Sequence, residues 1–90
     1  MDIKTKLYGC HWWTSAPEEC RHALEYLGFS IRIAGSRGSH NAKVYIPKEE
    51  QDRFDFEILN NTIVGSNRKF FFSKITQYGF PEYFVSYQRK

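Results

Sequence analysis

The chain has 90 residues, a formal net charge of +3, 41% hydrophobic residues and 18% aromatic residues. This length allows one modest hydrophobic core and excludes two, so we expect a single domain over residues 1–90. The sequence contains no run of roughly 18 apolar residues and no signal-peptide pattern, which predicts a cytoplasmic protein without a membrane partner.

The charges are unevenly distributed along the chain. Residues 48–57 contain five of the ten acidic residues and only two of the thirteen cations, so the other eighty residues carry eleven cations and five acids. A surface that is basic outside one acidic segment is typical of proteins that bind a polyanion, although the same excess can simply keep a small protein soluble. Nucleic acid is therefore the first partner to consider.

The first predicted element is a helix over residues 15–27. Ser15 can cap its N-terminus together with Glu18, and Pro17 falls in the first turn, where its missing N–H costs little. Gly28 follows the last turn, as is common at helix C-termini. The apolar stripe has the spacing i, i+3, i+4 and i+7 and consists of Cys20, Ala23, Leu24 and Leu27.

After this helix, apolar and polar residues alternate, which is the pattern of half-buried strands. We expect strands over residues 29–33 and 42–46, joined into a hairpin by the Gly-rich loop between them. The polar positions Arg32, Lys43 and Tyr45 would then face outward.

The segment after this hairpin allows two predictions. Phe54, Phe56 and Ile58 alternate with polar residues, which favours a strand, and Asn60-Asn61 would form the turn of a second hairpin. The alternative is a short helix beginning near Pro47, because proline and acidic residues are typical of a first helical turn. We prefer the strand, since the alternation of its apolar residues is complete.

The last third of the chain is dominated by aromatic and β-branched residues, which predicts further strands. These cover residues 62–64, 69–75 and 82–88. A turn is expected near residues 77–79, and residues 88–90 are expected to fray. Successive side chains of a strand point to opposite faces, so the run Phe70–Phe72 cannot be entirely buried. The predicted fold is α+β, with one principal helix packed on an antiparallel sheet of hairpins.

The Gly-rich loop over residues 35–41 carries an arginine, a histidine, two hydroxyls and two glycines that can adopt positive φ. This combination suits an anionic oxygen such as an RNA phosphate. Cations on the outer strand faces would hold further phosphates, and rings such as Tyr8, Tyr45 and Phe71 could stack on unpaired bases. The candidate RNA-binding residues are Lys4, Lys6, Arg32, Arg37, Gly38, Ser39, His40, Lys43 and Tyr45.

Metal binding is not expected. Cys10-His11 and the pair Cys20 and His22 do not have the spacing of a tetrahedral zinc site. Cys20 and His22 also project from different sides of the predicted helix, and Cys20 belongs to its apolar stripe. We therefore predict no metal and no cofactor.

Three motifs resemble those of the HicA-type mRNA interferases of toxin–antitoxin systems. They are Leu24–Phe29 (LEYLGF), Arg37–His40 (RGSH) and Val44–Pro47 (VYIP). The resemblance implies a small fold similar to double-stranded-RNA-binding domains, with a helix on a three-stranded antiparallel sheet. It also implies RNA as the substrate and His40 as the catalytic residue, presented by a turn at Gly38-Ser39.

The chain departs from that family's pattern at two places. Ile46 stands where the family usually has a histidine, and the Lys-rich helix that ends those proteins has no counterpart after Asn60. Cleavage by the His40 imidazole would also need a general acid and a cation. Arg37 is the nearest cation, but the sequence places no second histidine or carboxylate beside His40. The resemblance therefore supports RNA binding more than catalysis.

We predict a small basic RNA-binding protein without catalytic activity, acting in a toxin–antitoxin or phage-defence context in a bacterial or phage-infected cell. One alternative is a protein-binding inhibitor or adaptor, such as a phage-encoded counter-defence protein, with the acidic residues 49–57 as its contact surface. Another is a HicA-like endoribonuclease that uses His40. Sheet edges without a pairing strand are also compatible with a homodimer.

Overall fold

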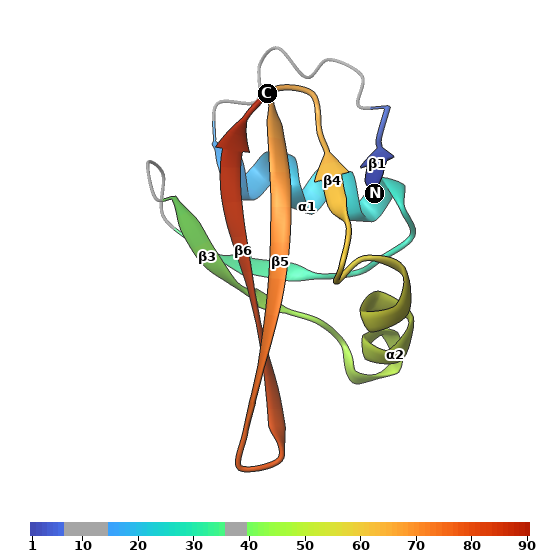
Figure 1. Ribbon diagram of the computed structural model, residues 1–90, viewed down its shortest axis with the longest axis vertical. Helices are drawn as coiled ribbons and strands as arrows, with labels where there is room; N and C mark the ends of the chain where they lie inside the picture. Colours follow the sequence, from blue (N-terminus) through green and yellow to red (C-terminus); the bar gives the residue numbers. More distant parts are fainter. Residues whose placement is uncertain (7–14, 36–39) are drawn as a thin grey trace.

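The computed structural model describes residues 1–6, 15–35 and 40–90, which form two helices and one six-stranded sheet (Figure 1). In chain order the elements are β1 (Asp2–Lys4), α1 (Ala16–Tyr26), β2 (Arg32–Ala34), β3 (Asn41–Tyr45), α2 (Lys48–Glu57), β4 (Thr62–Val64), β5 (Arg68–Gln77) and β6 (Phe80–Arg89). The strands lie in the order β1-β4-β5-β6-β3-β2. The predicted α+β class is confirmed.

Helix α1 forms as its sequence predicts. The Ser15 hydroxyl accepts a hydrogen bond from the Glu18 N–H at 3.4 Å, and Gly28 ends the helix with a φ of +93°. At that φ a side chain would be strained, which explains the glycine. The predicted apolar stripe is buried at Cys20, Ala23 and Leu24 and faces the sheet.

Strands β2 and β3 pair antiparallel as predicted, with Arg32 opposite Tyr45, but β2 begins at Arg32 and residues 29–31 of the predicted strand do not belong to it. Val44 and its neighbour Ala42 are buried on the inner face, whereas Tyr45 is exposed. The hairpin therefore shows the predicted alternation, in which one face is apolar and the other polar.

The preferred prediction for residues 54–58 is wrong, and the alternative helix is correct. Phe54 on α2 and Ile58 at its C-cap are buried one helical turn apart, whereas Phe56 is 90% exposed. The alternation seen in the sequence is therefore accidental, because the spacing i, i+4 of two buried residues fits a helix equally well. Asn61 consequently follows the end of α2, where its N–H bonds the Ile58 carbonyl oxygen at 2.9 Å, and it does not form a hairpin turn.

The sheet is mixed, which corrects the expectation of an antiparallel sheet. Strand β1 pairs in parallel with β4, with Ile3 beside Ile63, while all other neighbouring strands are antiparallel. A parallel pair needs a long crossover between its strands, so the short N-terminal segment gave no local indication of it.

Strands β5 and β6 form a long hairpin that extends beyond the other strands (Figure 1). Its turn at Tyr78-Gly79 has positive φ at both residues, as a type I′ hairpin turn requires. The expected fraying of residues 88–90 is wrong. Arg89 pairs with Arg68, and the Lys90 N–H donates to the Asn67 carbonyl oxygen at 3.2 Å.

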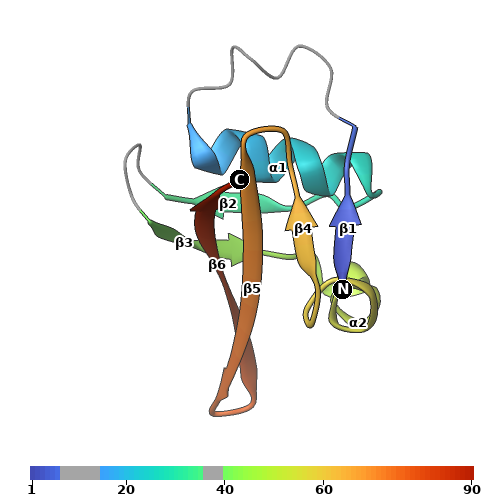
Figure 2. The same ribbon diagram turned by 45° about the horizontal axis from the view of Figure 1, so that its top comes forward.

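Both helices pack on the same face of the sheet, and Figure 2 shows α1 crossing behind strands β4 to β6. The central side chain is Phe54 of α2. Its ring makes edge-to-face contacts with Phe29, Phe72 and Tyr83 at centroid distances of 5.3–5.6 Å. Such contacts stabilise a core beyond the burial of apolar area alone. The inner face is thus filled and the outer face has no helix of the described residues against it.

Glu19 of α1 is fully buried, which the sequence did not predict. Its carboxylate accepts hydrogen bonds from the backbone N–H groups of Asn67 and Arg68 at 2.9 and 3.0 Å, and from the Arg68 guanidinium at 2.8 Å. Gly65 allows this approach, since a Cβ there would lie 2.4 Å from a carboxylate oxygen of Glu19. Glu19 therefore fixes α1 to the turn between β4 and β5.

We predict that Glu19→Ala lowers the free energy of unfolding by about 3 kcal/mol, because it removes the buried carboxylate that accepts three hydrogen bonds from Asn67 and Arg68. Glu25→Ala is the control on the same helix. Its carboxylate lies on the surface and pairs with Arg21 at 2.6 Å, so its loss should cost less than about 0.5 kcal/mol. Urea unfolding measures both, and equal losses would contradict the structural role of Glu19.

Candidate nucleic-acid interface

The outer face of the sheet carries the best-supported site. On β3, Lys43 and Tyr45 point away from the helices, as the burial of the intervening Val44 requires. On β2, Arg32 is exposed directly opposite Tyr45. Three of the residues expected to bind RNA are therefore brought together by strand alternation and hairpin register.

These three side chains form one compact cluster. The guanidinium carbon of Arg32 lies 4.8 Å from the centroid of the Tyr45 ring, and the Lys43 ammonium lies 5.2 Å from it. Both distances are within the range of cation–π attraction. Tyr45 is 40% exposed. Its ring therefore contacts two cations and still has surface that a ligand can reach.

One acidic side chain lies beside this cluster and reduces its positive charge. Glu82 of β6 lies on the same face, and its carboxylate is 3.6 Å from the Lys43 ammonium. Both groups are partly exposed, so the attraction is weak in water. Glu82 would nevertheless repel a phosphate and compete with it for Lys43.

Two aromatic side chains extend the outer face beyond this cluster. Phe71 of β5 is 37% exposed, and Phe84 of β6 is half-buried opposite Lys43. Sequence reasoning identified Phe71 but missed Phe84. The alternation of Phe84 with the buried Tyr83 and Val85 could have placed it on the outer face.

A groove borders the cluster where β3 ends. Its volume is about 270 Å³, and its lining includes Lys43, Tyr45, Phe80 and Glu82. The groove joins a ring, a cation and a concave surface at one end of the outer face. The rest of its lining is largely apolar and includes Val44, Ile46 and Pro81, so the groove offers a planar ligand apolar contact beside one cation and one carboxylate.

The other predicted residues lie elsewhere or are not described. Lys4 is exposed on β1, and Lys6 follows it, so both stand at the sheet edge opposite to Arg32 on β2. The structure therefore divides the predicted cations between two edges. Arg37, Gly38 and Ser39 lie outside the described residues, as does Tyr8.

His40 directly precedes β3, and its side chain is exposed. Its carbonyl oxygen accepts a hydrogen bond from the Tyr87 N–H at 3.0 Å. Within the described ranges no carboxylate and no second histidine forms a hydrogen bond or ion pair with its imidazole. The described part of the chain thus offers no general acid paired with His40.

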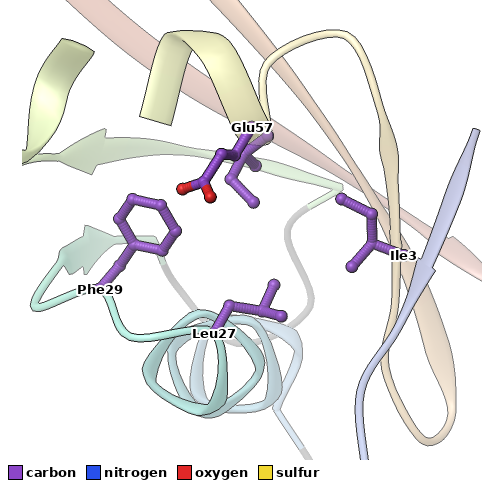
Figure 3. A pocket seen from close by; sticks show the side chains of 5 residues that line it. Ile3, Leu27, Phe29 and Glu57 are labelled. Atoms are coloured by element: carbon purple, nitrogen blue, oxygen red, sulfur yellow. The ribbon is translucent and has the colours of Figure 1, made fainter. Parts of the chain in front are cut away.

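A second pocket lies on the helix side of the molecule (Figure 3). It has a volume of about 180 Å³ and is lined by Ile3, Leu27, Phe29, Glu57 and Ile58. Its one charged group is the Glu57 carboxylate, which pairs with Arg53 at 3.2 Å. An apolar pocket with a carboxylate is unsuited to phosphate, so it does not belong to the candidate interface.

Among the described residues, no group of three or more histidine, cysteine or acidic side chains has the geometry of a metal site. Cys20 is buried, and this burial raises the pKa of its thiol well above the usual value. It therefore stays in the neutral form, which is a poor metal ligand. In the same described ranges neither helix has the length and apolar character to cross a bilayer.

Comparisons with protein-family models, curated protein sequences and solved structures give no match to this chain. The functional argument therefore depends on the geometry of the outer face.

Proposed function

We propose that the protein binds RNA through the outer face of its sheet and does so without catalysis. The observation that carries this proposal is the cluster of Arg32 and Lys43 around the half-exposed ring of Tyr45. Cations of this kind bind phosphates, and an accessible ring stacks on a base. The two helices occupy the opposite face, which leaves the cluster accessible.

The position of the acidic segment also supports RNA binding through the outer face. It forms α2, which packs on the inner face through Phe54. The Asp55 carboxylate of α2 accepts hydrogen bonds from the Lys74 ammonium at 2.5 Å and from the Tyr83 hydroxyl at 2.8 Å. Part of the acidic charge of α2 is therefore paired with side chains of the sheet. A polyanion approaching the outer face would meet cations while most of the acidic residues lie on another side.

We extend the HicA-type resemblance as part of this proposal. Of the matching motifs, Leu24–Phe29 covers the end of α1 and Val44–Pro47 covers the end of β3, whereas Arg37 to Ser39 lie outside the described residues. We therefore suggest a core related to double-stranded-RNA-binding domains and a role in toxin–antitoxin or phage-defence biology, with cytoplasmic RNA as the partner.

The charge of the cluster gives the first test. The double substitution Arg32→Ala/Lys43→Ala should weaken RNA binding by about tenfold at low salt, because two phosphate contacts are lost. The log–log dependence of affinity on salt should become shallower by about one to two, whatever the RNA sequence. Fluorescence anisotropy with a labelled RNA at several salt concentrations measures both effects.

A charge-matched control separates a site from general attraction. Arg21→Ala/Lys48→Ala removes two cations from the helices and should leave affinity within about twofold of the wild type. Equal losses in both double variants would contradict a site on the outer face. Absence of RNA binding by the wild type at low salt would end the proposal.

Glu82 gives a test with the opposite sign. Glu82→Gln removes a negative charge from the outer face and releases Lys43 from its ion pair, so RNA affinity should rise by about two- to fivefold at low salt. The gain should vanish at high salt, where exposed charges are screened. Glu49→Gln on α2 is the control and should have little effect. A lower affinity of Glu82→Gln would contradict the proposed contact.

The His40→Ala variant distinguishes RNA binding without catalysis from RNA cleavage. We expect the wild type to leave RNA uncut over hours, and His40→Ala to lower affinity by about 1 kcal/mol through loss of one contact. Gel analysis of a long RNA tests this directly. Cleavage by protein free of host nucleases, abolished by His40→Ala, would establish the endoribonuclease instead.

A protein-binding role has its own support in α2. Phe56 is 90% exposed there, beside the exposed acidic residues Asp52 and Glu57. An exposed ring flanked by carboxylates is the kind of surface that could bind a basic protein in place of RNA. If so, Phe56→Ala should abolish that interaction without changing RNA affinity.

A further inference from the structure

Three outer-face rings lie on one diagonal of the sheet register. Phe71 of β5 is opposite Ser86, which lies two residues from Phe84 on β6. Phe84 is in turn opposite Lys43, which lies two residues from Tyr45 on β3. Each step therefore crosses one strand and advances two residues in the same direction. We call Phe71, Phe84 and Tyr45 the ring diagonal.

The spacing of the ring diagonal follows from sheet geometry. Residues in this diagonal relation have Cα atoms about 7–8 Å apart, so adjacent rings are too distant to form one closed stack and near enough to bind successive units of one ligand. Ser73 lies opposite Phe84 and Ser86 lies opposite Phe71. Because both neighbours are small and exposed, the ring surfaces stay accessible.

Cations stand at both ends of this line. Lys69 precedes Phe71 by two residues on β5 and therefore shares its face, and Lys4 lies beyond it on β1. Arg32 and Lys43 flank Tyr45 at the other end. A ligand that follows the diagonal would meet positive charge where it arrives, rings along its path and positive charge where it leaves.

We propose that the ring diagonal stacks three successive unpaired bases, so that the ligand of the outer face is single-stranded RNA. This inference rests on the proposed RNA-binding function and specifies its substrate. Every base has a π-face, so such stacking tolerates different sequences. Bases in a duplex are already stacked on one another and cannot reach the rings, although their phosphates still attract the cations.

The first experiment compares three ligands with equal phosphate number. These are a short oligouridylate, the same strand with abasic sites at three adjacent central positions, and a duplex of half that length, whose two strands together carry the same number of phosphates. We expect the abasic strand and the duplex to bind at least about tenfold more weakly than the oligouridylate, measured by anisotropy. Equal binding of all three ligands would overturn the ring diagonal and leave the phosphate contacts of the proposed function intact.

The second experiment changes the rings. Phe71→Leu/Phe84→Leu keeps apolar bulk in the sheet and removes two π-faces, and Phe56→Leu on α2 is the matched control. The double variant should bind the oligouridylate at least about fivefold more weakly, with the salt dependence and the affinity for duplex unchanged. Thermal unfolding identifies any variant that fails to fold.

Photocrosslinking provides a readout that does not depend on stability. Iodouridine placed in the oligouridylate should crosslink to Tyr45, Phe71 or Phe84 of the wild type, as located by mass spectrometry. Crosslinks confined to α2 or to the helix side would overturn the inference. If the wild type binds none of the three ligands, the proposed function fails first and this inference fails with it.

Discussion

The buried carboxylate of Glu19 is the constraint on which the arrangement of the molecule depends. It receives hydrogen bonds from two backbone N–H groups and the Arg68 guanidinium, and thereby joins α1 to the turn between β4 and β5. A buried charge is costly unless it is fully paired, so alternative positions of α1 on the sheet are strongly disfavoured. Gly65 is required for the same reason, because any side chain there would occupy the space of the carboxylate.

Because α1 covers one side of the sheet, the other side stays open to solvent among the described residues. With α1 held by Glu19 and α2 held by Phe54 and Asp55, both helices bury the inner face, and the six strands present their alternate residues outward. The uneven charge of the sequence thereby becomes a spatial separation, since the acidic segment lies on α2 whereas Arg32 and Lys43 lie on the outer face. Packing alone separates the acidic helix from the basic cluster.

Local sequence features predicted the parts of the fold that local interactions determine. The cap at Ser15, the glycine at position 28 and the alternation through β2 and β3 each act within a few residues, and those elements were correct. Helix α2 was predicted only as the alternative to a strand, because Phe54 and Ile58 fit both periodicities. The parallel pairing of β1 and the partners of Glu19 join residues distant in sequence, so no local pattern could indicate them. In the candidate site, the same alternation placed Arg32, Lys43 and Tyr45 correctly, whereas the alignment of Phe84 with them depends on the β3–β6 register.

On the outer face, the cations and the rings would contribute to RNA binding in different ways. Phosphates are common to single strands and duplexes, so Arg32 and Lys43 would bind both and supply the part of the affinity that salt weakens. Stacking contributes about 1–3 kcal/mol per base and is offered only by unpaired bases. Selectivity for a single strand would therefore come from Phe71, Phe84 and Tyr45. Glu82 offsets Lys43 and would lower the phosphate-dependent part of the affinity for both forms alike, so the selectivity would depend on the rings alone.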